Sequence, residues 1–177
     1  MRAREGARIL GSMSSGRLKR TLALLILLLA FFGMADAAYL ATHAFSGEPL
    51  ICDIGSLSGC TIVASSTYSV LFGVPLAVYG VVFYALVFVL AALELVFFNA
   101  LLRRLLQGAA VVGAIAGIVF TFIQVYLINA LCIYCLMSAV VSFLILVCAS
   151  MLEPVRPRSP GPPPPPPATR LPMPPPA

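Results

Sequence analysis

The chain has 177 residues, of which 61% are hydrophobic and only 10% are charged. A soluble domain is roughly 45–50% apolar and about 25% charged, so this composition excludes a soluble enzyme, a nucleic-acid-binding module and a secreted disulfide scaffold. The formal net charge of +5 marks membrane topology rather than a binding surface, because all eleven Lys and Arg residues lie outside the long apolar runs.

Four stretches are long and apolar enough to cross a bilayer, which takes about 20 residues of helix. They are residues 21–41, 75–98, 105–128 and 131–151. The sequence therefore predicts an all-α membrane protein, a bundle of four transmembrane helices with a cysteine-bearing loop between the first two. We expect a basic N-terminal segment (1–20), the four-helix domain (21–152) and a proline-rich tail (153–177).

The positions of the cations predict the orientation of these helices. Lys and Arg precede the first helix, separate the second from the third, and follow the fourth, so both termini and the Arg103–Arg104 turn are expected in the cytoplasm. The segment 42–74 and a tight turn near Asn129–Ala130 then face the outside. The tail is too rich in proline for a helix or paired strand, and we expect it to be extended and disordered.

The N-terminal segment has a second interpretation. Its basic residues, the apolar run and the triplet Ala35-Asp36-Ala37 also resemble a signal peptide with its cleavage site. Cleavage would leave three helices, with 42–74 still outside. We favour a retained helix, for the family reason given below.

Four single residues carry structural expectations. Pro75 suits the first turn of the second helix, where its missing N–H group would have no partner. Gly113 and Gly117 form a GxxxG pair, which we expect to serve ordinary helix packing. Glu94 lies about one turn from the cytoplasmic end of the second helix and is expected to reach the membrane interface.

Four of the five cysteines form two pairs that the helix count places on the same, outer face. Cys132 and Cys135 form a C-x-x-C at the start of the fourth helix, where free backbone N–H groups and the helix dipole stabilise a thiolate. Cys52 and Cys60 bound a short loop rich in glycine and serine, which can bring its two ends within disulfide range. Cys148 lies about 20 Å further along the fourth helix and is expected to be a small buried hydrophobe.

Two pairs on one face favour a relay of electrons by thiol–disulfide exchange. The structural alternatives are a loop staple for Cys52 and Cys60, and two inert packing cysteines for Cys132 and Cys135. A zinc site fits poorly because the C-x7-C spacing is not that of a zinc finger, so no metal is expected. His43 is expected to be an interfacial residue rather than a base.

Over roughly residues 21–150 the chain resembles the vitamin K epoxide reductase family. The segments that carry the resemblance are YLATH (39–43), Cys52, CTIVASSTYS (60–69), FGVPLAVYG (72–80), Phe83-Tyr84 and CIYC (132–135). Because the resemblance begins inside the first apolar run, that run is expected to be a retained helix. The resemblance implies a four-helix bundle that holds a quinone, ubiquinone or menaquinone, near its outer face beside the C-x-x-C.

The resemblance also implies a role for each cysteine. Cys52 would receive electrons from a reduced partner, Cys60 would pass them to Cys132, and Cys135 would be the sulfur nearest the quinone. Ser66 matches a Ser or Thr of the family that hydrogen-bonds near the quinone or assists exchange. The alternative for Ser66 is a helix or turn cap.

Two departures bear on the substrate. Vertebrate members carry an Asn on the second helix and a Tyr four residues after the C-x-x-C, whereas the corresponding positions here are Leu76 and Ala139, which argues against epoxide reduction. The FGVPLA run resembles prokaryotic members, which use quinone to oxidise thioredoxin-like proteins. We therefore predict a quinone-dependent thiol–disulfide oxidoreductase of the cell (inner) membrane. Its partners would be membrane lipid and a separate thioredoxin-like (DsbA-like) protein on the outer side, with no nucleic acid.

Three rival functions remain open at this point. One is vitamin K epoxide or quinone reduction of the vertebrate type, and another is a non-enzymatic four-span scaffold with structural disulfides. A DsbB-type oxidase is disfavoured because its C-x-x-C lies in the first outer loop. The aromatic candidates for the quinone pocket are not separable from sequence: Phe83, Tyr84, Phe122 and Tyr126.

Overall fold

The computed structural model describes residues 2–48, 52, 59–97 and 99–152, with side chains described from residue 16 onward. The expectation of an extended proline-rich tail falls on residues 153–177, which lie outside the described residues. Most of the Cys52–Cys60 loop, residues 53–58, lies outside them as well.

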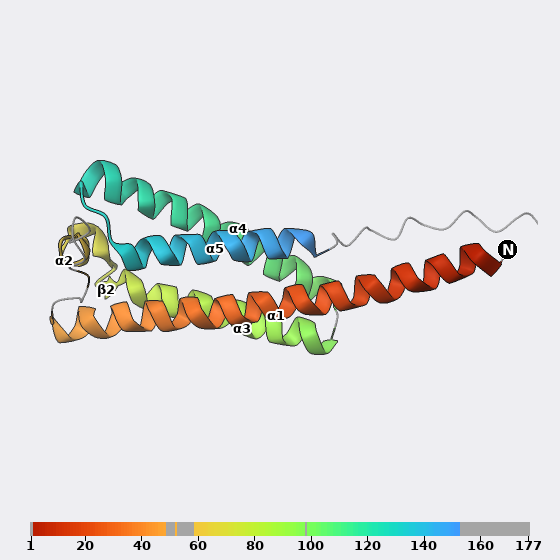
Figure 1. The fold of residues 1–177 in the computed structure, drawn as a ribbon. Coiled ribbons are helices and arrows are strands. Elements are labelled where there is room, and N and C mark those ends of the chain that lie inside the picture. The colour runs from red at the N-terminus through yellow and green to blue at the C-terminus, as the bar shows by residue number, and fades with distance from the viewer. Residues whose placement is uncertain (1, 49–51, 53–58, 98, 153–177) are drawn as a thin grey trace, which may run out of the picture.

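Four long helices form an elongated bundle, which confirms the predicted all-α membrane fold (Figure 1). They are α1 (Arg2–Ser46), α3 (Leu76–Phe97), α4 (Ala100–Phe122) and α5 (Ile133–Met151). Each contains a stretch long and apolar enough to cross a membrane. The start of α1 and the end of α5 lie at one end of the bundle, and the short elements between α1 and α3 lie at the other (Figure 1).

Helices α1 and α4 differ most from the predicted ranges. The segment 1–20 was expected as a basic terminus separate from the first helix, but from Arg2 onward it continues α1, which also runs on to Ser46. No proline interrupts this stretch, and proline is the residue that most strongly breaks a helix. At α4, the side chain of Asn99 accepts a hydrogen bond from the Leu101 N–H at 3.0 Å and caps the helix. Arg103 and Arg104 therefore lie within α4 rather than in a turn.

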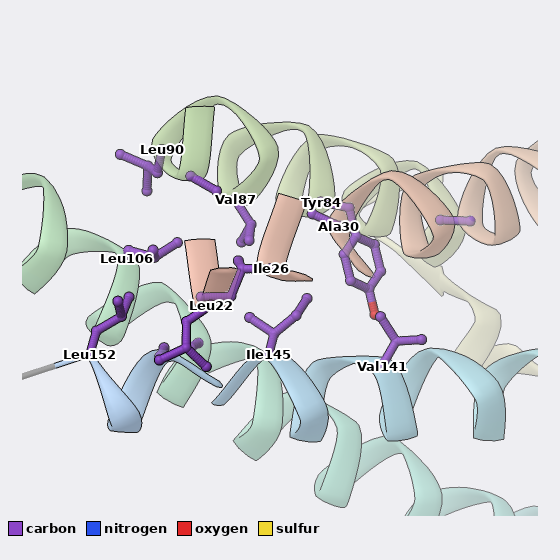
Figure 2. Packing of buried hydrophobic residues seen from close by; sticks show 14 residues of the cluster. Leu22, Ile26, Ala30, Tyr84, Val87, Leu90, Leu106, Val141, Ile145 and Leu152 are labelled. Atoms are coloured by element: carbon purple, nitrogen blue, oxygen red, sulfur yellow. The ribbon is translucent and has the colours of Figure 1, made fainter. Parts of the chain in front are cut away.

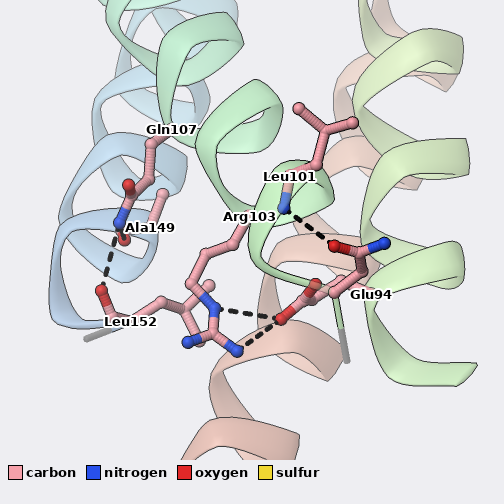
Figure 3. A network of polar contacts seen from close by, with 7 residues as sticks. Glu94, Leu101, Arg103, Gln107, Ala149 and Leu152 are labelled. Atoms are coloured by element: carbon pink, nitrogen blue, oxygen red, sulfur yellow. Dashed lines mark hydrogen bonds and ion pairs between the residues drawn. The ribbon is translucent and has the colours of Figure 1, made fainter. Parts of the chain in front are cut away.

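The expectation that Glu94 reaches the membrane interface is wrong. The side chain is buried, and its Oε1 accepts hydrogen bonds from Arg103 Nε at 3.0 Å and Arg103 Nη2 at 2.8 Å (Figure 3). The early start of α4 brings Arg103 back against α3, so a partner compensates the buried carboxylate. On the same side, Gln107 Nε2 donates to the carbonyls of Ala149 and Leu152 at 3.0 and 3.1 Å and ties α4 to the end of α5.

The middle of the bundle is an aliphatic core drawn from all four helices (Figure 2). Glycines let the helices approach closely: a Cβ at Gly33 would lie 2.5 Å from the Tyr84 ring, and one at Gly117 would lie 3.2 Å from Ala139. A Cβ at Gly113 would meet the Phe83 ring. Gly113 and Gly117 thus pack against helices of the same chain, as expected for ordinary packing.

Short elements close the end of the bundle that carries the cysteines. They are α2 (Cys60–Ala64), the 3-10 helix η2 (Thr67–Ser69), and the antiparallel strands β1 (Val70–Leu71) and β2 (Val74–Pro75). Phe72 and Gly73, both with positive φ, make the two-residue turn between the strands. This hairpin is absent from the all-α prediction, and Pro75 ends β2 directly before α3 instead of opening that helix.

The connection from α4 to α5 carries a second irregular element. The α-helix gives way to the π-helix η3 (Ile123–Ile128), which ends at Asn129 in the left-handed conformation with φ 53°. Asparagine adopts that conformation more readily than most residues. The predicted tight turn near Asn129–Ala130 is confirmed.

Candidate redox site

The structure brings the two cysteine pairs together at one end of the bundle. Cys52 and Cys60 are joined by a disulfide, and Cys132 and Cys135 are free thiols. Cys52, Cys60 and Cys132 are at most 2% exposed and share one buried cluster, against which Cys135 packs. Both pairs thus lie at the same end of the bundle.

A close backbone approach holds the first pair against the second. A Cβ at Gly59 would lie 2.5 Å from the Leu131 carbonyl oxygen and 2.8 Å from its nitrogen, so any other residue here meets backbone atoms. Gly59 directly precedes Cys60, and Leu131 directly precedes Cys132. The contact between these two neighbours therefore fixes the separation of the two cysteines.

The C-x-x-C lies where helix α5 begins. The predicted helix started at residue 131, whereas α5 starts at Ile133 and Cys132 is its N-cap, with its sulfur accepting from the Cys135 N–H at 3.5 Å. Cys135 follows within the first helical turn, as expected. A sulfur in this position can accept hydrogen bonds from the backbone N–H groups of the first helical turn, which have no partner within the helix.

This arrangement lowers the pKa of the Cys132 thiol to about 7. The largest cause is the hydrogen bond from the Cys135 side chain, and the backbone N–H groups of Cys135 and Tyr134 act in the same direction. Burial of the sulfur and the negative charge of Asp36 oppose them. Cys132 therefore carries a substantial thiolate fraction at neutral pH, which is the reactive form in exchange.

A cavity of about 380 Å³ lies beside the cysteines, between α1, α3, α4 with η3, and α5. Its walls are mostly apolar, and Cys60, Cys132, Cys135 and Ser66 all line it. The volume falls in the range of about 300–1,000 Å³ typical of ligand pockets. Three of the four paired cysteines and Ser66 therefore line the same apolar cavity.

The Ser66 side chain caps the end of the short helix α2, which is the structural alternative for this residue. Its hydroxyl donates to the Val63 carbonyl at 2.7 Å, in the last turn of α2, and makes no capping hydrogen bond to η2. The oxygen of Ser66 keeps its acceptor lone pairs on the cavity wall.

The structure separates the four aromatic candidates. Phe83 and Tyr84 line the cavity, whereas Phe122 and Tyr126 stack on each other at 4.4 Å and are 54% and 67% exposed. The Tyr84 hydroxyl lies 2.8 Å from the Ser138 carbonyl and hydroxyl oxygens and 2.9 Å from the Ser142 hydroxyl. Leu76 and Ala139 both lie on the wall, so these positions present apolar surface to the cavity.

Two polar residues near the site escaped the sequence reasoning. Gln124 is 4% exposed and its Oε1 accepts the Cys132 N–H at 2.9 Å. Asp36 lies in α1 with its Oδ2 buried and without a hydrogen-bond partner among the described residues, and its charge acts on Cys132. Each is a polar residue inside an apolar run, and that signal alone marks a functional candidate in a membrane helix.

The other candidates lie apart from this chemistry. Cys148 is half-buried against the aliphatic core, not fully buried as expected, and lies away from the two pairs. His43 is half-buried, and its ring lies 4.5 Å from that of Tyr39. Within the described ranges, no three His, Cys, Asp or Glu side chains gather as a metal ion would require.

Comparison with known proteins gives two matches. Residues 24–150 match the model of the vitamin K epoxide reductase family. Over 117 residues the chain is 37% identical to thiol-disulfide oxidoreductase LTO1 of Arabidopsis thaliana, a match that covers 62% of this chain and 31% of that protein. The matched region is thus less than a third of this relative's length.

Proposed function

This chain belongs to the vitamin K epoxide reductase family, and from that premise we propose that it is a membrane thiol–disulfide oxidoreductase. It oxidises a thioredoxin-like protein and delivers the electrons to a quinone. The observation that carries the proposal is the packing of two cysteine pairs against one apolar cavity. A scaffold with purely structural disulfides would need neither this cavity nor the free thiols of Cys132 and Cys135 beside it.

The residues of the cavity suit a quinone ring. Its mostly apolar walls match a flat hydrophobic ligand, and the sulfurs of Cys132 and Cys135 lie on that wall. When bound, ubiquinone or menaquinone supplies an acceptor for two electrons and two protons. The apolar surface at Leu76 and Ala139 does not favour the epoxide chemistry of the vertebrate members.

The first exchange takes place at the loop pair. A thiolate of the reduced partner attacks the sulfur of Cys52 and breaks its bond to Cys60, and the second partner thiol then resolves the mixed disulfide. The partner leaves oxidised, and Cys52 and Cys60 hold the two electrons and two protons as thiols. Cys60 follows the close contact between Gly59 and Leu131 and is therefore the member placed to exchange with Cys132.

The second exchange moves the electron pair to the C-x-x-C. The Cys60 thiolate attacks Cys132 of the Cys132–Cys135 disulfide and releases Cys135, and Cys52 then attacks Cys60 and releases Cys132. A leaving thiol with a low pKa departs faster, and the pKa of Cys132 is lowered to about 7. Finally the two thiols lose two electrons and two protons to the acceptor, and the bond between Cys132 and Cys135 forms again.

We place the cysteine end of the bundle on the outer side of the cell (inner) membrane and both termini in the cytoplasm. The described Lys and Arg side chains support this, because they lie toward the opposite end of the bundle: Arg17, Lys19, Arg20, Arg103 and Arg104. Positive residues are enriched on the cytoplasmic side. The thioredoxin-like partner is then an extracytoplasmic protein.

Quinone absorbance tests the proposal, with purified protein in detergent and a reduced thioredoxin-like donor. We expect quinone reduction to stop in Cys135→Ala and to continue at the wild-type rate in the matched Cys148→Ala variant of the same helix. Equal effects of the two substitutions would remove the assignment. No reduction of ubiquinone or menaquinone analogues by the folded wild type would favour a scaffold with structural disulfides.

A further inference from the structure

We propose that Gln124 donates a hydrogen bond from its side-chain amide to a carbonyl oxygen of the bound quinone. The inference rests on the proposed function and deepens it, since it names the polar contact that orients the acceptor in this chain. Gln124 is 4% exposed, lies in η3 and lines the cavity beside Cys132 and Cys135.

The π-helix is what places Gln124 there. The Gln124 carbonyl accepts the Ala130 N–H at 3.1 Å, and the side-chain Oε1 accepts the Cys132 N–H at 2.9 Å. Both contacts tie η3 to the linker that leads into α5. Single π-helical turns are rare and occur frequently at functional sites.

The contact with Cys132 also fixes which way the amide points. A backbone N–H can only donate, so the Gln124 atom that faces Cys132 is the oxygen, and Nε2 is directed elsewhere. Nε2 has no hydrogen-bond partner among the described residues. Among those residues, the fully buried polar side-chain atoms that lack a partner are Asp36 Oδ2 and Glu94 Oε2, and Nε2 is not one of them. An amide with two unused donors inside an apolar bundle is costly unless a ligand satisfies it.

Most hydroxyl groups of the cavity wall are already committed as donors. Ser66 donates to the Val63 carbonyl, Ser69 donates to the Ser66 carbonyl at 2.8 Å, and Tyr79 donates to the Leu71 carbonyl at 3.1 Å. The hydroxyls of Tyr84, Ser138 and Ser142 bond to one another and to a carbonyl.

What remains on the described wall is one exposed hydroxyl, weak thiol donors and the Gln124 amide. The hydroxyl is that of Tyr68, whose side chain is 50% exposed. A quinone carbonyl only accepts hydrogen bonds, so it requires a donor. Gln124 Nε2 is the buried amide donor that this wall offers.

Binding of oxidised quinone to the oxidised full chain tests the inference, because no reductant is present and no turnover occurs. The probe is short-chain ubiquinone labelled with ¹³C at its carbonyls. Infrared difference spectra report the hydrogen bond to the carbonyl, and equilibrium dialysis gives the Kd. The variants are Gln124→Leu, which removes the amide, and Gln124→Glu, which in its ionised form keeps an acceptor for the Cys132 N–H and offers no donor. The Gln124→Glu spectra are recorded at a pH at which the infrared bands show the carboxyl to be ionised. Gln107→Leu is the matched control, because it removes another amide of the same helical segment at the far end of the bundle.

In the wild type and in Gln107→Leu we expect one carbonyl band shifted to lower frequency. Both Gln124 variants should lose that shift and bind ubiquinone about three- to tenfold more weakly, the range of one net hydrogen bond. An unshifted band in the wild type, an unchanged Kd in both Gln124 variants, or an equal loss in Gln107→Leu would overturn the inference. If the wild type still reduces quinone in that case, the proposed function stands; if it neither binds nor reduces quinone, the proposed function fails.

Discussion

A methyl group at position 59 should uncouple the two cysteine pairs without altering either one. The backbone of Gly59 has φ −78° and ψ −7°, which alanine adopts without strain, so the effect of Gly59→Ala is purely steric. The new Cβ would lie 2.5 Å from the Leu131 oxygen, whereas ordinary contacts are 3.4–4 Å. Because both sides of this contact are backbone, the two segments must separate by about 1 Å, and a misplacement of that size can cost about 100-fold in rate.

We therefore expect Gly59→Ala to slow transfer from the Cys52–Cys60 dithiol to the Cys132–Cys135 disulfide by about 10- to 100-fold. Rapid mixing with a reduced donor, quenching with an alkylating reagent and mass spectrometry show which pair holds the electrons at each time. Gly108→Ala is the matched control, because a Cβ there has no atom within 4 Å. Transfer in Gly59→Ala at the rate of Gly108→Ala would refute the role of this contact.

Four further predictions concern pH, charge and stability. The pKa of Cys132 is lowered from 9.0 to about 7. The rate of Cys132 alkylation should therefore reach half its maximum near pH 7, increase at higher pH and decrease at lower pH. Asp36→Asn should move that profile to lower pH, since the Asp36 charge raises the pKa of Cys132; no movement would contradict this. Arg103→Leu should destabilise the fold by about 3–5 kcal/mol because it leaves the buried Glu94 charge unpaired, and the double variant with Glu94→Gln should recover much of that loss in a thermal unfolding assay. Gly33→Ala should lower the Tm, because its Cβ would lie 2.5 Å from the Tyr84 ring; an unchanged Tm would show that the ring moves aside freely.

The architecture was accessible from sequence wherever one chain segment decides the outcome by itself. Each of the four apolar runs of about 20 residues predicts a membrane helix. Two such helices, an even number of crossings, separate Cys52–Cys60 from Cys132–Cys135 and return the chain to the same end. The turn at Asn129 follows from the readiness of asparagine to adopt positive φ. These inferences depend on composition and local conformation, not on which residues meet in space.

What escaped prediction depends on contacts between distant segments or on capping. Hydropathy assigned Arg103 to a turn because arginine is polar, yet backbone hydrogen bonding continues through it once Asn99 caps the helix. Glu94 looked interfacial because its partner could not be identified before the fold was known. Gly59 and Leu131 are 72 positions apart in the chain, and no local sequence pattern predicts their close approach.

The π-helix η3 makes segment length itself a determinant of the site. A π-helical turn contains one residue more than the α-helical turn that it replaces, so η3 behaves as a built-in single-residue insertion. Deleting an exposed member such as Val125, which is 42% exposed, would allow an ordinary α-helical turn and would shorten the segment between Gln124 and Cys132 by one residue. Gln124 would then lose its register with Cys132 although every side chain that bonds to either residue is still present. Around this cavity, single-residue insertions and deletions should be less tolerated than substitutions of exposed side chains.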